Sequence, residues 1–149
     1  MLNRRDMVVA AVAVLVAGAA VAGLSQAAGT PQMRSRVFQW AQLKPEASKT
    51  GERREVFDAP TATLDRFASH ITTLNPGQAP HPAHKHPEEE LMIVRQGTLE
   101  VTLNGQPTRV ETGGMIFCAS NEMHGLRNVG TTKATYFVVK WFPHNLAHK

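Results

Sequence analysis

The chain has 149 residues, of which 42% are hydrophobic and 19% are charged, and its formal net charge is +4 at pH 7. This length is typical of one domain with one hydrophobic core. The basic excess is mild, with no block of lysine and arginine and no alternation of basic with aromatic residues, so we expect no nucleic-acid partner.

Residues 1–27 are predicted to be an export signal rather than part of the fold. Arg4 and Arg5 precede an apolar run over residues 7–24, and Ser25-Gln26-Ala27 offers small residues at the two positions that a signal peptidase reads. The paired arginines and the mildly hydrophobic run favour the twin-arginine route of bacteria. An ordinary secretory signal and an uncleaved membrane anchor are the alternatives. We expect a periplasmic or secreted protein, with no stable membrane insertion once the signal is cleaved.

The rest of the chain is predicted to consist of short strands. We expect a flexible leader over residues 28–35 and a single domain over residues 36–149. Residues 44–52 hold Pro45 and Gly51 and are interpreted as a loop. No segment after the signal has a 3.6-residue apolar period, so we predict an all-β sandwich or barrel. The expected strands are 37–40, 54–57, 64–74, 91–94, 98–103, one beginning at 109, 115–118, 125–128 and 134–141.

Two of these strands have distinct patterns. Residues 91–94 form a continuous apolar run, which predicts a strand buried on both faces. Residues 98–103 alternate, so Leu99, Val101 and Leu103 should share one face. The following Asn104-Gly105 pair is the strongest short signal of a two-residue hairpin.

The stretch from His84 to Glu90 is the most informative part of the chain. Residues two apart share one face of a strand, so His84 and His86 should point the same way. Glu90 should point the same way if the chain stays extended between them, although Pro87 favours a turn or a bulge in this stretch. His124 follows 34 residues after Glu90. Three imidazoles and one carboxylate suit iron(II), manganese, nickel, copper or zinc, and would leave an octahedral ion two open positions.

These residues also belong to two spaced motifs that resemble those of the cupin family. The second motif departs from the family pattern at Ala119, where proline is usual, and at Asn121, where glycine is usual. Asn tolerates a positive φ, so Asn121 is expected to make the same turn. The resemblance covers residues 60–141. The motif positions are Gly77, His84, His86, Glu90 and Gly97 in the first, and Gly113, His124 and Asn128 in the second.

The resemblance implies a cupin-type double-stranded β-helix, or jelly-roll barrel, with one divalent transition metal inside. Its ligands would be His84, His86, Glu90 and His124. Manganese or iron is favoured because a twin-arginine substrate folds before export, and nickel, copper and zinc are alternatives. Weaker candidates for catalytic groups are Glu88, Glu89 and His81. Candidate pocket walls, which would equally fill a barrel, are Met92, Met115, Phe117, Leu126 and Tyr136.

Several other side chains are interpreted as structural. We expect His70 to be a hydrogen-bonded structural residue, Cys118 to be a buried and inert thiol, and Asn128 to hold a backbone turn. The pair Arg53-Arg54 is interpreted as part of a solvated strand face. The sequence offers no evident arginine clamp for a carboxylate.

Two classes of function follow. The first is a metal-dependent enzyme acting on a small molecule, such as a dioxygenase, isomerase or decarboxylase. The second is a non-catalytic periplasmic protein that binds a small ligand or the metal itself. A homodimer is expected in either case, because apolar residues gather near both ends of the domain. They are Val37, Phe38, Trp40, Phe137, Val139 and Trp141.

Overall fold

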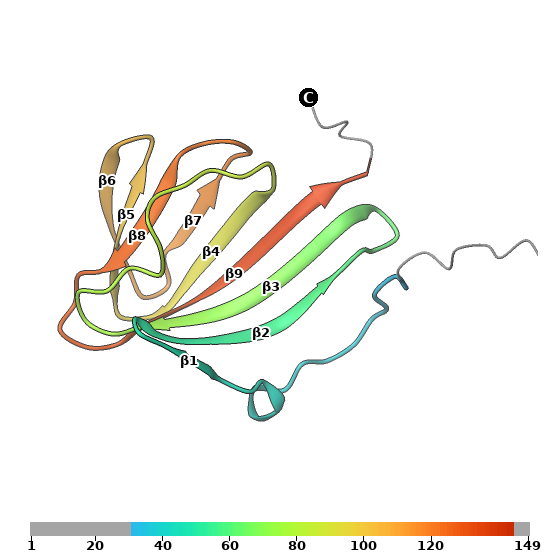
Figure 1. Cartoon of the computed structure of the whole chain (residues 1–149), viewed down its shortest axis with the longest axis horizontal. Helices are drawn as coiled ribbons and strands as arrows, with labels where there is room; N and C mark the ends of the chain where they lie inside the picture. Colours follow the sequence, from blue (N-terminus) through green and yellow to red (C-terminus); the bar gives the residue numbers. More distant parts are fainter. Residues whose placement is uncertain (1–30, 145–149) are drawn as a thin grey trace, which may run out of the picture.

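This computed structural model describes residues 31–144, and their strands form two antiparallel sheets (Figure 1). The larger sheet has the order β1-β2-β3-β9-β4-β7, and the smaller has the order β6-β5-β8. The all-β prediction is therefore confirmed. The elements are η1 Trp40–Gln42, β1 Glu46–Ser48, β2 Gly51–Ala59, β3 Leu64–Leu74, β4 Glu89–Gln96, β5 Thr98–Leu103, β6 Gln106–Glu111, β7 Met115–Cys118, β8 His124–Asn128 and β9 Ala134–Pro143.

The predicted export signal lies outside the described residues. Within residues 31–144, the structure contains no helix with the length and apolar character needed to cross a membrane.

The region before β2 differs from the prediction in two respects. Residues 37–40 do not form a strand. The Phe38 ring packs on that of Phe57, with centroids 5.3 Å apart, and the 3-10 turn η1 begins at Trp40. Residues 44–52 are not a loop, since they contain β1 and the start of β2. Gly51 lets the start of β2 lie close to the end of β3, because a Cβ there would lie 1.9 Å from the Thr73 carbonyl oxygen. The sequence shows no strand period here because β1 is a short, exposed edge strand.

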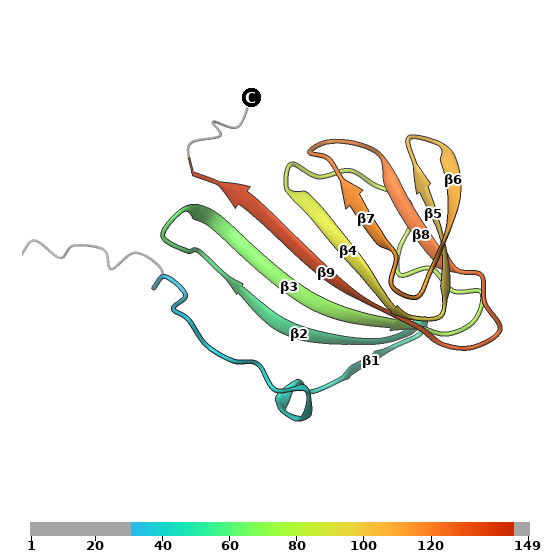
Figure 2. The ribbon, with the colours of Figure 1, turned by 180° about the vertical axis from the view of Figure 1, so that it is seen from behind.

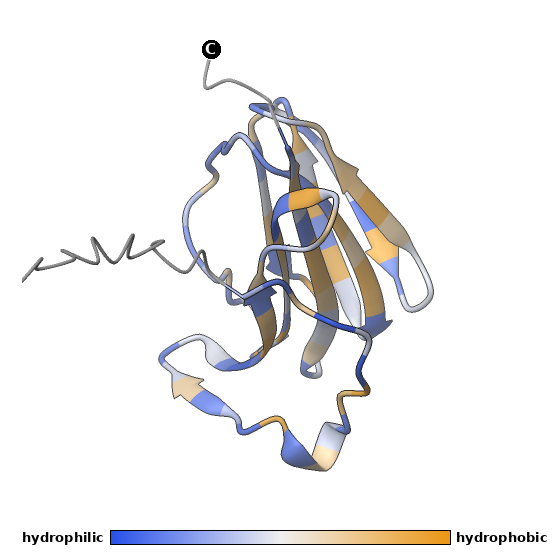
Figure 3. Cartoon of the chain, turned by 90° about the vertical axis from the view of Figure 1, so that its right-hand side faces the viewer, coloured by the Kyte–Doolittle hydropathy of each residue, from blue (hydrophilic) through white to orange (hydrophobic). Residues whose placement is uncertain are grey.

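The hydrophobic core lies between the two sheets, which curve toward each other (Figure 2). Residues of β4, β7 and β9 that point inward alternate with residues on the outer face, as strand geometry requires. The apolar residues gather on the strands, whereas the connecting loops are mostly polar (Figure 3). The buried core consists of Leu74, Met92, Val94, Leu99, Val101, Ile116, Cys118, Ala134, Tyr136 and Val138.

The two strand patterns singled out in the sequence have different outcomes. In β4, Met92 and Val94 are buried but Leu91 and Ile93 are only partly covered, so the prediction of burial on both faces is wrong. Among residues 31–144, no second layer covers the outer face of the larger sheet there. In β5, the alternating face is confirmed, and the hairpin that follows has φ of 48° at Asn104 and 84° at Gly105. Both positive angles are what a type I′ turn requires.

Candidate metal centre

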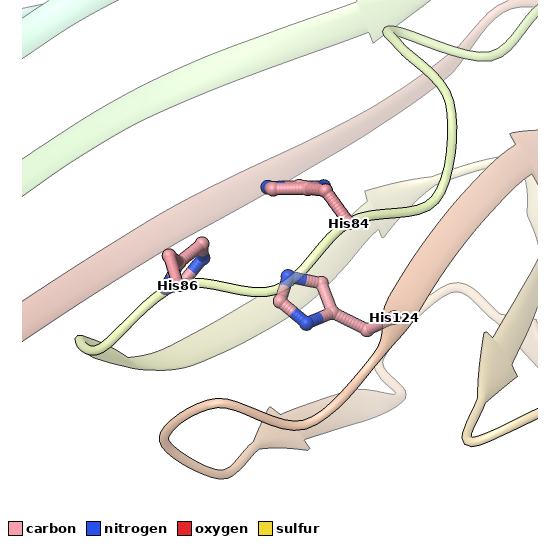
Figure 4. Close-up of side chains that lie close together, drawn as sticks. All are labelled: His84, His86 and His124. Carbon is pink, nitrogen blue, oxygen red and sulfur yellow. The ribbon is translucent and has the colours of Figure 1, made fainter.

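Three histidine side chains from two distant segments meet inside the fold (Figure 4). His84 and His86 lie on the loop that leads into β4, and His124 begins β8. The backbones of His84 and His124 bond each other twice, with both N–O distances 2.9 Å. Because of this pairing, one ring nitrogen from each of the three imidazoles lies within 4.8 Å of the other two.

Hydrogen bonds determine which ring nitrogen of each histidine faces the centre. In His124, Nδ1 donates to the Glu122 carbonyl oxygen at 2.9 Å, and in His86, Nδ1 donates to the Glu88 carbonyl oxygen at 3.0 Å. The Nε2 atoms of these two histidines therefore carry no proton, and that of His86 accepts a hydrogen bond from Lys140 Nζ at 3.2 Å. Among the described residues, His124 Nε2 is buried without a hydrogen-bond partner, and so is His84 Nδ1. Buried polar atoms without partners are costly, so these nitrogens fit a metal ion.

Glu90 supplies a carboxylate to the same space. Its side chain is buried, and Oε2 lies 3.3 Å from His86 Nε2 and 2.9 Å from Lys140 Nζ. Strand register explains this contact, because Glu90 is paired with Lys140 on one side and with Cys118 on the other. Two overlapping sets of possible ligand atoms result, one of His84, His86 and His124 and one of Glu90, Cys118 and His124. Three imidazoles and one carboxylate are a donor set that suits a divalent transition metal.

Cys118 also lies at this centre, within a group that includes Glu90 and His124. Burial, followed by the negative charge of Glu90, raises the pKa of Cys118 to about 12. The side chain is therefore a neutral thiol at pH 7, as the interpretation of a buried, inert cysteine predicts.

The turn between β7 and β8 positions His124. Asn121 has a φ of 60°, which confirms that it makes the turn for which the family usually uses glycine. Its backbone N–H bonds the His86 carbonyl oxygen at 2.8 Å, so this turn is tied to the loop that carries the other histidines. Asn128 at the end of β8 is fully buried and bonds the backbone of Leu74, Gly130 and Thr132, which confirms its structural role.

A cavity of about 80 Å³ adjoins the histidines. Its apolar wall includes Met92, Leu126 and Val138, and its polar wall consists of Arg53, His70, His81, Tyr136 and Lys140. Burial lowers the pKa of His84, with smaller contributions from the neighbouring histidines, which favours the neutral imidazole that metals bind. Burial also raises the pKa of Tyr136, so its hydroxyl stays protonated.

Two of the five predicted pocket residues do not face this cavity. Met115 and Phe117 are 67% and 53% exposed, because they occupy the outward positions of β7 while Ile116 and Cys118 point inward. The other three, Met92, Leu126 and Tyr136, line the cavity.

The three weaker catalytic candidates differ in whether they line the cavity. Glu89 accepts a hydrogen bond from Trp141 Nε1 at 2.7 Å and does not line the cavity. Glu88 forms an ion pair with Arg66 at 2.7 Å and does not line the cavity. His81 does line it, and its ring lies 4.3 Å from that of His84.

Three polar residues of the cavity were not expected there. His70 lies on the cavity wall rather than in a purely structural position. Arg53 borders the cavity from β2, although about half of its side chain stays exposed, as expected for a solvated strand face. Lys140 is the third. The inward position of Lys140 could have been predicted from alternation along β9, because Lys140 shares a strand face with Tyr136 and Val138. The face of Arg53 depends on the pairing of β2 with β3, which local sequence does not reveal.

Comparisons with known proteins agree with this geometry. The family described as Cupin domain matches residues 70–140. The chain is 31% identical to the polyketide synthase CurC of Streptomyces cyaneus over 106 residues, which are 69% of this chain and 67% of the relative. The chain therefore belongs to the cupin family, as its two motifs indicated.

Solved structures support the jelly-roll fold. The cupin domain of Cnp3 from Schizosaccharomyces pombe has a TM-score of 0.62 at 14% identity, covering 73% of this chain and 75% of that one. The polyketide cyclase RemF from Streptomyces resistomycificus has a TM-score of 0.58 at 23% identity, covering 78% and 89%. A predicted oxalate decarboxylase from Thermotoga maritima has a TM-score of 0.57 at 24% identity, covering 72% and 99%. The fold is thus the predicted cupin-type barrel.

Proposed function

We propose that this protein is an exported, metal-dependent cupin enzyme that acts on a small organic molecule. The observation that carries the proposal is the convergence of His84, His86, Glu90 and His124 beside a cavity, with His124 Nε2 buried and without a partner. An ion held by these residues would act as a Lewis acid on a substrate oxygen, or would bind oxygen, at its open positions. Manganese or iron is the proposed ion, with nickel, copper and zinc as alternatives.

The protein's own side chains contribute position and environment. Met92, Leu126 and Val138 exclude water from one side of the cavity, which strengthens electrostatic interactions within it. The ammonium group of Lys140 and the protonated hydroxyl of Tyr136 supply hydrogen-bond donors on the other side. Both groups suit the stabilisation of negative charge that develops on a substrate oxygen.

The size of the cavity supports a small substrate. Pockets for drug-sized ligands typically measure about 300–1,000 Å³, against about 80 Å³ here. Two relatives are a polyketide synthase and a polyketide cyclase by name. They support an enzyme that acts on an organic molecule, but a polycyclic substrate would exceed the cavity next to the histidines.

Metal content tests the site. We expect His86→Ala and His124→Ala to remove most of the bound metal from the purified protein, measured by elemental analysis, because each loses one of four ligands. His81→Ala is the matched control, since His81 lines the same cavity but lies outside the converging set. Full metal occupancy in either ligand variant would reject the assignment.

Turnover separates an enzyme from a binding protein. The metal-loaded protein should convert a candidate substrate in air, and a chelator should stop the conversion. Binding of the same molecule without any conversion would favour the alternative of a periplasmic small-ligand or metal-binding protein.

Export rests on the N-terminal sequence alone. Replacing Arg4 and Arg5 with Lys should retain the protein in the cytoplasm if the twin-arginine route is used. Export at the level of the parent would contradict that route.

A further inference from the structure

A second hollow opens beside the cavity of the metal centre. It measures about 220 Å³, and both hollows share Arg53, His70, Pro80, His81 and Tyr136 in their walls. The shared residues form a neck between the two spaces. A ligand that reaches the histidines from the outer hollow must therefore pass these side chains.

The outer hollow has a largely polar wall, which includes one carboxylate, Glu52, already paired with Arg54 at 3.2 Å. Its wall includes Ser48, Thr50 and Thr72, whose hydroxyl groups offer hydrogen bonds to a polar ligand. The inner cavity, in contrast, is partly apolar at Met92 and Val138. The two spaces together suit an elongated ligand with one end at the histidines and a polar remainder.

Arg53 is aimed into the neck by strand pairing. It lies opposite Thr72 of β3, which in turn lies opposite Tyr136 of β9, so all three side chains share the inner face of the sheet. Its guanidinium forms an ion pair with Glu55 at 2.7 Å, in which both side chains are about half exposed. Exposed pairs of this kind contribute about 0–1 kcal/mol, so a carboxylate on a ligand could replace Glu55 at little cost.

The charges around the inner cavity favour an anion. Its lining residues include two fixed cations, Arg53 and Lys140, but Glu90 is the sole carboxylate among them, and it is already bonded to Lys140. Burial, followed by the positive charges of Arg53 and Lys140, lowers the pKa of His70 to about 4. Both cations therefore contribute positive potential at the cavity wall. A divalent ion at the centre would add to this positive charge.

We propose that the substrate is a small organic carboxylate whose carboxylate group binds Arg53 in the neck while its reacting end reaches the metal centre. This inference rests on the proposed metal-dependent function. Arg suits this role because its guanidinium forms two parallel hydrogen bonds to a carboxylate, which fixes the orientation of the ligand as well as its charge.

Calorimetric titration of the metal-loaded protein tests the proposal. The probes are malonate, succinate and glutarate, which span different lengths, and their uncharged diamides. We expect the best-fitting diacid to bind at least about tenfold more tightly than its diamide. Arg53→Gln should weaken that binding by about tenfold or more, and Arg53→Lys should restore part of it, since truncating one partner of a charge-assisted pair commonly has an effect of this size.

The matched control is Arg109→Gln. Arg109 also forms a pair with a glutamate two residues later on its strand, Glu111, but it lies on β6 and does not line either hollow. Affinity for the diacid should not change in this variant. Metal content and thermal unfolding are measured for every variant, so a loss of binding is not mistaken for a loss of metal or of fold.

The outcomes separate this inference from the function on which it rests. If the parent protein takes up no metal, the proposed function fails. If Arg53→Gln keeps its metal and binds the diacid as tightly as the parent, the assignment of Arg53 is overturned, because the carboxylate is then held by the metal or by Lys140. Equal affinity for the diacid and its diamide would overturn the choice of an anionic substrate.

Discussion

At the scale of single residues, Lys140 has an unusual place beside the candidate ligands. Its Nζ lies 2.9 Å from Glu90 Oε2 and 3.2 Å from His86 Nε2, the two atoms that would bind the metal from this side. An ammonium so close to the ion competes for the same acceptors and repels the added positive charge. We therefore expect Lys140 to weaken metal binding while it places a positive group at the cavity wall.

We expect Lys140→Met to increase the affinity for Mn²⁺ by about tenfold, which corresponds to about 1.4 kcal/mol. Competition with a chelating dye would measure the change, with Lys133→Met as a control at an exposed position. Weaker binding in Lys140→Met would show instead that Lys140 holds Glu90 in position.

His70 makes stability depend on pH. Its pKa is about 4 in the folded protein against 6.5 for an ordinary histidine, chiefly because of burial. The unfolded chain therefore takes up a proton first as the pH falls. The contribution of neutral His70 to the unfolding free energy is fully present above pH 6.5, and it decreases as the pH falls toward 4.

For the metal-free protein, we expect this residue to account for about 2 kcal/mol of the decrease in unfolding free energy between pH 7 and pH 4. Denaturant unfolding of the parent and of His70→Gln at both pH values measures it. The variant should lose less stability than the parent on acidification. Parallel losses in the two proteins would contradict the argument, and the lowered pKa of His84 acts equally in both.

At the scale of elements, the turn between β7 and β8 connects backbone conformation to the candidate site. Asn121 holds a φ of 60° and bonds the His86 carbonyl oxygen through its backbone. A residue without the conformational tolerance of Asn or Gly would be strained there. The turn thus keeps the two histidine-bearing segments in register.

We expect Asn121→Ala to lower the unfolding free energy by about 1 kcal/mol, and Asn121→Gly to change it by less than about 0.5 kcal/mol. Both are measured by denaturant unfolding. The backbone hydrogen bond is kept in both variants, so only the cost of the positive φ differs between them. Equal destabilisation by Ala and Gly would show that the Asn side chain matters instead.

At the scale of the whole molecule, the outer face of the larger sheet supports the prediction of a homodimer. Met115 and Phe117 are exposed on β7, and the Phe117 ring stacks on Trp141 of β9 with centroids 6.3 Å apart. Leu91 and Ile93 on β4 are only partly buried on the same side. Exposed apolar patches of this kind commonly mark an interface between proteins.

The mature chain has a mass of about 13 kDa from its length, and we expect light scattering to give twice that mass. Phe117→Glu should yield a monomer that remains folded, because it places a charge on the apolar face without touching the core. Met123→Glu, at another exposed apolar position, should leave the dimer intact. A parent protein of about 13 kDa at micromolar concentration would reject the dimer.

The sequence by itself determined the family and the all-β class, and it pointed to the three histidines that the fold brings together. Strand alternation and the Asn104-Gly105 turn are local patterns, so geometry follows from them within a few residues. The meeting of His124 with His84 and His86 spans distant segments, and it was expected from the resemblance of the two motifs to those of cupins. The same local alternation made Leu99 and Val101 recognisable as core.

Tertiary structure alone decided which faces the remaining residues present. Met115 and Phe117 were expected as pocket walls but point outward, while Arg53 is half exposed, as expected, and also borders both hollows. Parity within a strand shows which residues share a face, but not which face turns toward the core. The face that turns inward depends on pairing between distant strands, such as β2 with β3. This pairing therefore decides which side chains surround the cavity.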